Sequence, residues 1–395
     1  MILIFTAKQD GHIESVSRHL DAAGAAWVRI NTEDFATNVE LTLTPATGSG
    51  TLLVRDSGKR IDLRAVTSVW YRKPEPVVLA HFSLDPGALQ YVDAEFSEIL
   101  MGIYALLGHA IWINSPFTTR LAHRKLRQLQ VATQAGFQVP RTLVTNDLAE
   151  VRRFADELQG DLAIKSLGSL NVTENSGEQT VQYGLFTRRI SRAELEAVAD
   201  KVGCMPTLYQ QFIEKNRELR ITCVGRQVFS CSIEAREGDI TSDDHRFDTK
   251  RLKHTAYPCP EMHNKLHRYM AAFGLNFACF DILIAKTGEA IFCECNANGQ
   301  WLWCEEMAGL PIGKAIAELL MGSGAVNGQS CNSGVAADRD HHWPYSREGR
   351  LHAEIKSLRS ELSRAEHRAE ECAMQHENER SRLVRGAAKS WRPGL

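Results

Sequence analysis

The sequence predicts an α/β (α+β) protein with a charged helical tail, and three observations support this fold class. The chain opens on a strand, a helix and a second strand, a pattern typical of a parallel-sheet domain: residues 2–7 are apolar, residues 13–23 have helical spacing, and Trp27–Ile30 are again apolar. A hairpin pattern covers residues 278–296. Beyond about residue 322 the composition shifts to Gly, Ser and Asn, which indicates a linker before a heptad-like segment.

The first predicted domain, residues 1–116, continues with three further elements. These are a strand at Ala65–Tyr71 followed by Arg72-Lys-Pro74, a helix at 88–107, and a strand at Ile111–Ile113 followed by Asn114-Ser-Pro116. No G-x-G-x-x-G follows the first strand. Nothing here therefore indicates a dinucleotide site.

Two further segments follow, residues 117–205 and residues 206–321. The first is predicted to hold a helix at 118–135, a strand at 141–144, a helix at 147–158 capped by Asn146 or Asp147, a strand at 161–165 and a turn region at 166–177. The second is predicted to hold strands at 207–213, 219–224 and 227–234, a helix at 261–273, the hairpin and a last helix at 311–320.

The last segment, residues 322–395, carries a seam of apolar or small residues that alternate by four and three. Its members are Leu351, Ile355, Leu358, Leu362, Ala365, Ala369 and Cys372. A solvated single helix, a disordered tail and a two-helix association all remain open. We assign no catalysis to this segment.

The composition is that of an ordinary globular protein and does not indicate a membrane-spanning or nucleic-acid-binding protein. The 395 residues are 44% hydrophobic and 24% charged with a net charge of −2, as in ordinary globular proteins. This balance gives no electrostatic reason to expect nucleic acid or an anionic membrane as partner. No apolar run approaches the length needed to cross a bilayer.

Ten cysteines are scattered through predicted strands and helices, without any C-x-x-C. We interpret most of them as small buried side chains in a reducing cytoplasm, against zinc or disulfide roles. Cys293 and Cys295 flank Glu294 in one strand, so both are expected to face away from it.

The hairpin carries the most informative chemistry. If Ala285 lies opposite Ala290, Asp281 lies directly opposite Glu294, and Asn296 shares a strand face with Glu294. Two like charges so placed are destabilising unless a cation lies between them, and all-oxygen ligation suits magnesium. The alternative is a pair of surface carboxylates on a solvated face.

Two lysines and a following segment suggest nucleotide binding. Lys165 ends a short apolar strand before a Gly-containing loop, a place where a compact cation can meet phosphate oxygens. A solvated side chain is the alternative for Lys165. Lys125, on a predicted helix, is by itself interpreted as a solvated side chain. The strand at 208–213 is followed by Glu218-Leu-Arg220, where a carboxylate could meet ribose hydroxyls and a guanidinium could meet phosphate. Arg220 could equally form an ion pair with Glu218 or Glu214.

Taken in order, these residues resemble an ATP-grasp ligase. The series is Lys125, Lys165, Gln-Gln-Phe-Ile at 210–213, Glu218-Leu-Arg220, Asp281 and Glu294-x-Asn296. More closely, residues 1–321 resemble the ATP-grasp ligases that mature microviridin-type peptides (graspetides). The matching stretches are Trp70–Pro74, Asn114–Pro116, Lys125–Leu129, Gly136–Pro140, Leu185–Thr187 and Asn298–Trp303, the last being the most specific.

The resemblance implies an ATP-grasp fold with an N-terminal Rossmann-like pre-ATP-grasp domain, and the cofactors ATP and Mg²⁺. It implies that Lys125 and Lys165 contact the ATP phosphates, that Gln210, Gln211, Phe212 and Ile213 frame the adenine, and that Glu218 holds the ribose. It implies that Asp281, Glu294 and Asn296 bind magnesium, and that Arg220 and Arg246 steady the transferring phosphoryl group and the acyl phosphate. The sequence departs from the subgroup at Asp244-His-Arg246, which leaves the role of His245 open.

The implied partner is a ribosomally made precursor peptide, with a leader and a core segment. We expect Arg188 and Arg189 to contact the leader. Trp301 and Trp303, placed on one strand face, could pack in the core or line a groove for the peptide. The implied reaction activates Asp or Glu side chains and closes ester or amide rings. A homodimer is compatible with the resemblance.

Two other interpretations remain open. One is an ATP-grasp ligase that joins two separate molecules, namely an amino acid or small amine and a separate carboxylate substrate. The other is a nucleotide-dependent peptide-binding protein without catalysis.

Overall fold

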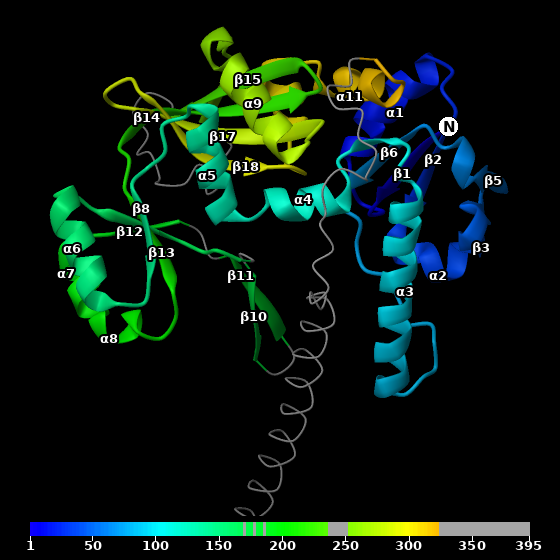
Figure 1. The fold of residues 1–395 in the computed structure, drawn as a ribbon, viewed down its shortest axis with the longest axis horizontal. Coiled ribbons are helices and arrows are strands. Elements are labelled where there is room, and N and C mark those ends of the chain that lie inside the picture. Colours follow the sequence, from blue (N-terminus) through cyan, green and yellow to red (C-terminus); the bar gives the residue numbers. More distant parts are fainter. Residues whose placement is uncertain (169–170, 177–178, 185–186, 236–251, 324–395) are drawn as a thin grey trace, which may run out of the picture. The chain divides into compact units, whose positions relative to one another are not determined.

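The computed structural model describes residues 1–168, 171–176, 179–184, 187–235 and 252–323. Figure 1 shows the fold of these residues. The described residues divide into two units, one made of residues 1–78 and 100–323 and the other of residues 79–99. The predicted heptad segment lies outside the described residues. No helix among the described residues is long and apolar enough to cross a membrane.

The N-terminal part is built on a parallel sheet in the order β2-β1-β6-β7. The strands are β1 (Ile2–Thr6), β2 (Trp27–Asn31), β6 (Ser68–Arg72) and β7 (Ile111–Ile113), and helices α1 (His12–Ala22), α2 (Phe35–Asn38) and α3 (Pro86–Leu106) follow β1, β2 and β6 along the chain. The predicted strand-helix-strand opening is observed. An antiparallel sheet of β3 (Val39–Thr44), β4 (Ser49–Val54) and β5 (Lys59–Asp62) was not predicted.

A second sheet, in the order β12-β9-β13-β8, is antiparallel. Three helices lie between its strands in the sequence. The strands are β8 (Thr142–Thr145), β9 (Leu162–Lys165), β12 (Arg188–Ile190) and β13 (Thr207–Gln211), and the helices are α6 (Leu148–Leu158), α7 (Arg192–Ala197) and α8 (Ala199–Val202). The predicted cap of α6 is Asp147, whose carboxylate accepts from the Ala149 amide at 2.8 Å. Strands β10 (Asn171–Ser176) and β11 (Gln179–Gly184) form a separate hairpin.

The third sheet, in the order β16-β15-β14-β17-β18, holds the predicted hairpin. Its strands are β14 (Lys215–Val224), β15 (Gln227–Ala235), β16 (Leu252–Ala256), β17 (Phe277–Ala285) and β18 (Ala290–Asn296). Alternate residues such as Ile221, Phe280 and Phe292 bury one face against α5 (Lys125–Ala135) and α9 (His263–Phe273). The pleat therefore turns the intervening, largely polar positions to the opposite face.

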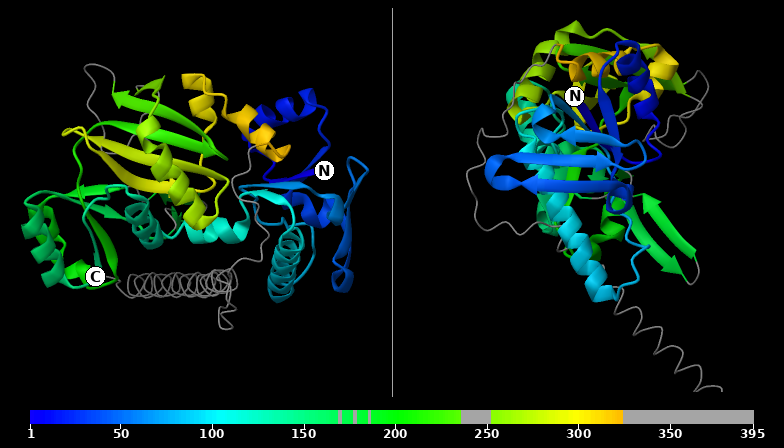
Figure 2. Two further views of the ribbon diagram at one scale, coloured as in Figure 1. Left: turned by 45° about the horizontal axis from the view of Figure 1, so that its top comes forward. Right: turned by 90° about the vertical axis from the view of Figure 1, so that its right-hand side faces the viewer.

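Helices α10 (Leu302–Ala308) and α11 (Ile312–Leu320) follow β18 and connect it to the parallel sheet. Helix α11 packs against α1, as the neighbouring orange and blue helices of Figure 2 show. No space for a side chain exists at Gly313, where an added Cβ would lie 2.2 Å from Ser15 Oγ. The Ser68 hydroxyl also donates to the Leu320 carbonyl at 2.6 Å. The N-terminal sheet and α1 are therefore in direct contact with α11, the helix at the end of the segment that contains the predicted hairpin.

Candidate active site

Three neighbouring strands present a lateral row of charged groups. Arg220 on β14 lies opposite Asp281 on β17, and Asp281 lies opposite Glu294 on β18. Arg220 Nη1 donates to Asp281 Oδ1 at 2.7 Å, and Asn296 Nδ2 lies 3.2 Å from Glu294 Oε1 and 3.5 Å from Asp281 Oδ2. Rotating the terminal amide of Asn296 by half a revolution about its Cβ–Cγ bond places Oδ1 where Nδ2 now lies. Two carboxylates and an amide oxygen can thus face one point, which fits a magnesium ion.

The pairing of Asp281 with Glu294 is confirmed, but the predicted register at the turn is wrong. Ile284, and not Ala285, lies opposite Ala290, and the register shifts by one residue between Ile282 and Asp281. The extra residue in β18 is Cys293, which makes the shift a β-bulge. Because the bulge interrupts the alternation of side chains, Cys293 lines the same pocket as Glu294 and does not face away from it. Cys295 does lie in the opposite, apolar core.

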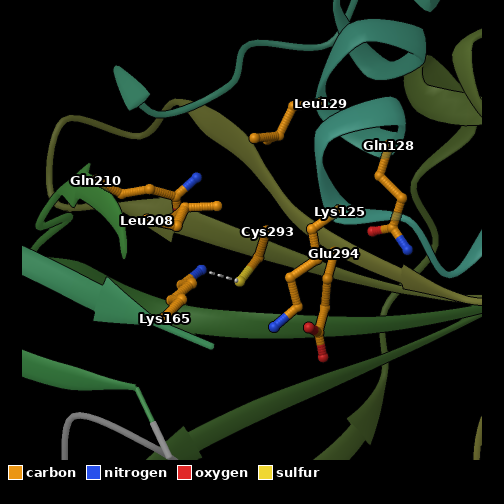
Figure 3. A pocket seen from close by; sticks show the side chains of 8 residues that line it. All are labelled: Lys125, Gln128, Leu129, Lys165, Leu208, Gln210, Cys293 and Glu294. Carbon is orange, nitrogen blue, oxygen red and sulfur yellow. Dashed lines mark hydrogen bonds between the residues drawn. The ribbon is translucent and has the colours of Figure 1, made fainter. Parts of the chain in front are cut away.

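A pocket beside this row brings together residues from β9 and β13 of the second sheet, from β18 of the third sheet and from α5 (Figure 3). Its lining residues are Lys125, Gln128, Leu129, Lys165, Leu208, Gln210, Cys293 and Glu294. Four of the site residues inferred from the sequence therefore share one cavity, namely Lys125, Lys165, Gln210 and Glu294. Gln211, Phe212, Ile213 and Glu218 are not among its lining residues.

Lys165 is the central cation of this pocket. Its Nζ lies 3.3 Å from Cys293 Sγ. Burial opposes the charged ammonium, but the interactions with Cys293, Glu294 and Asp281 outweigh burial and raise the pKa of Lys165 above its ordinary value. Burial also raises the pKa of the Cys293 thiol. Lys165 is thus held charged where a phosphate could meet it.

The helix predicted at 118–135 is interrupted, and the interruption places Lys125. Helix α4 (Pro116–Ala122) ends before His123, and Lys125 is the first residue of α5. The Lys125 ammonium donates to the Ser166 carbonyl, in the loop after β9. Lys125 therefore links α5 to the strand that carries Lys165.

Gln128, one turn further along α5, is a residue that the sequence analysis missed. Its Nε2 donates to the carbonyls of Ala122 and Cys295 at 2.7 Å each, and its Oε1 accepts from the Cys295 amide at 3.0 Å. These bonds fix the β18 backbone next to Glu294. A single buried glutamine in an amphipathic helix carries no sequence signal for this role.

The segment expected to frame a nucleotide base runs from the end of β13 to β14. Gln210 is buried, and its Nε2 donates to Thr142 Oγ1 at 2.9 Å. The backbone amides of Gln211 and Phe212 are bound to the carbonyls of Arg141 and Asp161, so these two N–H groups are engaged within the sheet. Glu218 forms an ion pair with Lys215 at 2.5 Å and not with Arg220.

The residues expected to contact a peptide differ in exposure. The side chain of Arg188 is 70% exposed, while Arg189 pairs with Asp161 at 2.5 Å and lies over the Phe212 ring. Trp301 is completely buried and packs against His12, so in this structure it belongs to the core and lines no groove. Trp303 contacts the ring of His254. Arg246 lies outside the described residues.

The predicted common face of the two tryptophans is also wrong. The residues after Trp301 form α10 and not a strand, so the alternation assumed from the sequence does not apply.

A buried cluster from the parallel sheet contacts the loop that follows β18. Asp10 Oδ1 lies 2.7 Å from His12 Nδ1, and Asp10 Oδ2 lies 3.2 Å from Arg72 Nε. The Trp301 amide points to His12 Nε2 at 3.4 Å. A neutral imidazole with its proton on Nδ1 satisfies both contacts, since it donates to Asp10 and accepts from Trp301. Burial accordingly lowers the pKa of His12, with Arg72 and Lys73 acting in the same direction and Asp10 opposing.

We expect the free energy of unfolding to fall as the pH drops below about 6.5, the ordinary histidine value. His12 stays neutral in the folded chain at pH values where the unfolded chain already binds a proton, so acid favours unfolding. One such group contributes at most about 1.4 kcal/mol per pH unit. Urea unfolding over this range should show a shallower slope for His12→Gln. His123, whose pKa is also lowered by burial, should retain part of the slope. An unchanged slope would contradict the assignment to His12.

Comparison with known proteins identifies the family. A family model described as the RimK-like ATP-grasp domain matches residues 122–320, half of the chain, and one described as the MvdD pre-ATP grasp domain matches residues 1–120. The chain belongs to the RimK-like ATP-grasp family. The resemblance inferred from the sequence is confirmed, as is the α/β ATP-grasp fold with its pre-ATP-grasp domain. The predicted boundaries at 116, 205 and 321 stay predictions.

Solved structures similar to this ATP-grasp chain include two peptide-bound enzymes. The macrocyclase MdnC of Microcystis aeruginosa, bound with precursor peptide MdnA, is 28% identical with a TM-score of 0.70, and the match covers 82% of this chain and all of that one. A RiPP-associated ATP-grasp ligase of Chryseobacterium gregarium, in complex with ADP and a leader and core peptide, is 26% identical with a TM-score of 0.72, covering 81% and 96%.

The ATP-grasp chain also matches a glutathione synthetase of Synechococcus elongatus at 28% identity over 160 residues. This match covers 40% of the present chain and spans 42% of the length of that relative.

Proposed function

We propose that this protein is an ATP-dependent peptide ligase that closes side-chain rings in a ribosomally made precursor peptide. In this proposal it activates Asp or Glu carboxylates as acyl phosphates and joins them to Ser or Thr hydroxyls or Lys amines. The observation that carries the proposal is the row Arg220, Asp281 and Glu294 beside a lysine-lined pocket. The similarity to two peptide-bound ligases over four fifths of the chain supports a peptide as substrate.

The residues of the pocket suit the first half-reaction, in which a peptide carboxylate oxygen attacks the γ-phosphorus of ATP and the bond to ADP breaks. Lys125 and Lys165 would hold the phosphates, and Gln210 would lie towards the base. Magnesium held by Asp281, Glu294 and Asn296 would offset the negative charge of the phosphates. Arg220, fixed by Asp281, would steady the transferring phosphoryl group, and Glu218 would hold the ribose.

The second half-reaction needs no nucleophile from the protein. A hydroxyl or amine of the same peptide attacks the acyl carbon, phosphate leaves with one former carboxylate oxygen, and the attacking group loses a proton. We further propose that Arg188, exposed on β12, contacts the leader. Arg246 as a second phosphate-binding arginine, a homodimer and a cytoplasmic location stay predictions.

The test is a reaction of the purified protein with ATP, Mg²⁺ and a precursor peptide encoded beside its gene. Mass spectrometry should show the loss of one water for each ring, with one ADP formed per ring. Formation of ADP without any mass change in the peptide would contradict the proposal.

A second candidate function is supported by the glutathione synthetase match, since that enzyme's name denotes a ligase for small molecules. In this case the ATP-grasp site would join a carboxylate to a separate amine. The same assay distinguishes the two functions, because joining a second molecule increases the mass of the substrate.

A further inference from the structure

The run Asn298-Gly-Gln-Trp301, which follows the metal-binding strand, is held by side chains from the parallel-sheet part. Arg72, at the end of β6, is 1% exposed and reaches this loop with both of its terminal nitrogens. Its Nη1 donates to the Asn298 carbonyl at 2.9 Å and to Asn298 Oδ1 at 3.1 Å, and its Nη2 donates to Gln300 Oε1 at 2.8 Å. One planar guanidinium therefore fixes two residues of the loop.

The same loop also holds Arg220. The Gln300 carbonyl accepts from Arg220 Nη2 at 2.7 Å, while Arg220 Nη1 binds Asp281. A continuous chain of hydrogen bonds therefore runs from Arg72 through Gln300 to Arg220 and ends at Asp281. The chain connects a residue of the N-terminal sheet to a carboxylate of the lateral row.

Close packing leaves the loop little freedom. An added Cβ at Gly299 would lie 2.6 Å from Cys279 Cβ and 2.9 Å from Arg220 Nη2, so only glycine fits between them. Just before the loop, Asn114 Nδ2 donates to the Ala297 carbonyl at 2.7 Å, and its Oδ1 accepts from the amides of Asn276 and Phe277 at 2.8 and 3.1 Å. The loop is thus held at both ends by residues that precede position 120.

We propose that Arg72 is a positioning residue for the metal site, acting through Gln300 on Arg220 and through Asn298 on Asn296. This inference rests on the proposed function, since it takes Asp281, Glu294 and Asn296 as metal ligands. It gives the N-terminal domain a role in the chemistry of a site to which it contributes no ligand. It also explains the Gly-Gln-Trp run as the part of the loop that receives Arg72, Arg220 and His12.

Arg72 is suited to this role because its charge is matched locally. Asp10 neutralises it from the opposite side, so the guanidinium adds no net charge next to the cation site. A lysine would keep the charge but could not reach Asn298 and Gln300 with a planar pair of donors. Partners that orient metal ligands from outside the ligand set typically change metal affinity 10–100-fold.

The experiment measures Mn²⁺ binding to the full-length protein in the presence of ADP by electron paramagnetic resonance. Arg72→Lys, Arg72→Gln and Gln300→Met should each weaken Mn²⁺ binding about 10-fold or more. Arg64→Gln is the matched control, because Arg64 is an exposed arginine of the same domain that pairs only locally with Asp62, and it should leave binding unchanged. If Arg72→Gln does not fold because Asp10 loses its partner, the double variant Asp10→Asn, Arg72→Gln removes both charges.

Hydrogen exchange separates positioning from general stability. Amide exchange in Arg72→Lys should accelerate at residues 297–301 while β1 and β18 keep their protection. Equal Mn²⁺ affinity in the wild type and in all Arg72 and Gln300 variants would overturn the inference. Accelerated exchange throughout the parallel sheet would equally overturn it, since Arg72 would then be a structural residue alone. Failure of the wild-type protein to bind Mn²⁺ with ADP would instead contradict the proposed function.

Discussion

Replacing Glu294 by Gln should abolish ring formation while leaving the fold intact. Glu294 and Asp281 are directly opposed on neighbouring strands, and like charges so placed repel each other. Removing one charge relieves this repulsion, but it also weakens the attraction that keeps Lys165 charged, so the two effects on stability oppose each other. It further removes one of the two carboxylates available to a magnesium ion. We expect at least about a 100-fold loss of Mg²⁺-dependent activity, more than the loss of an outer partner would cause. The free energy of unfolding should change by less than about 1 kcal/mol.

The control for this variant lies in the same hairpin. Glu289 is an exposed carboxylate in the turn between β17 and β18, and it accepts from the Thr287 hydroxyl. Glu289→Gln should therefore leave both activity and stability unchanged. Cyclisation that persists in Glu294→Gln at wild-type rate would show that this carboxylate holds no essential cation.

Replacing Arg220 by Met should produce the largest loss of stability among the site variants. Arg220 is 8% exposed, and its contacts are the carboxylate of Asp281 at 2.7 Å and the Gln300 carbonyl at 2.7 Å. Burial opposes its charge, but Asp281 outweighs burial and raises the pKa of Arg220 above its usual value. Removing one partner of a buried ion pair leaves the other uncompensated, at a cost of about 3–5 kcal/mol. Chemical denaturation of the purified variant measures this loss.

A second substitution separates stability from chemistry. The double variant Arg220→Met, Asp281→Asn removes both charges, so it should recover most of the lost free energy of unfolding. Activity should remain absent, because the double variant lacks both a proposed metal ligand and the guanidinium proposed to steady the phosphoryl group. A double variant no more stable than Arg220→Met alone would show that the ion pair is not the source of the loss.

The local part of the site could be predicted from the sequence, because it depends on strand alternation. The β-branched and aromatic residues of β17 and β18 predict a hairpin. Antiparallel pairing of its two strands from the turn outward places Asp281 opposite Glu294. The bulge at Cys293 could not be predicted, because nothing in the amino-acid composition of the strand shows which residue lacks a partner on the neighbouring strand. The predicted register is off by one residue at the turn, and the unpredicted bulge shifts the register back by one residue. The pairing of Asp281 with Glu294 is therefore correct although the register at the turn is not.

The long-range part of the site required the structure. Lys125 and Lys165 were assigned through resemblance, because a lysine on a helix or at a strand end is commonly solvated. Arg72 and Gln300 are 228 residues apart, and their contact depends on how the parallel sheet packs against the end of β18. No local periodicity encodes such a contact. For the same reason the sequence left open whether Trp301 packs in the core or lines a groove, and its contact with His12 places it in the core.

The most direct measurement concerns the oxygen atoms of the peptide. A precursor peptide whose Asp and Glu side chains carry a heavy-oxygen label should transfer one labelled oxygen to the phosphate released with each ring. This transfer follows because the carboxylate oxygen that attacks the γ-phosphorus leaves with the phosphate. Mass spectrometry of the released phosphate shows whether it contains the labelled oxygen, as the account predicts. Phosphate without label, formed together with closed rings, would contradict activation of a peptide carboxylate at the Asp281–Glu294 site.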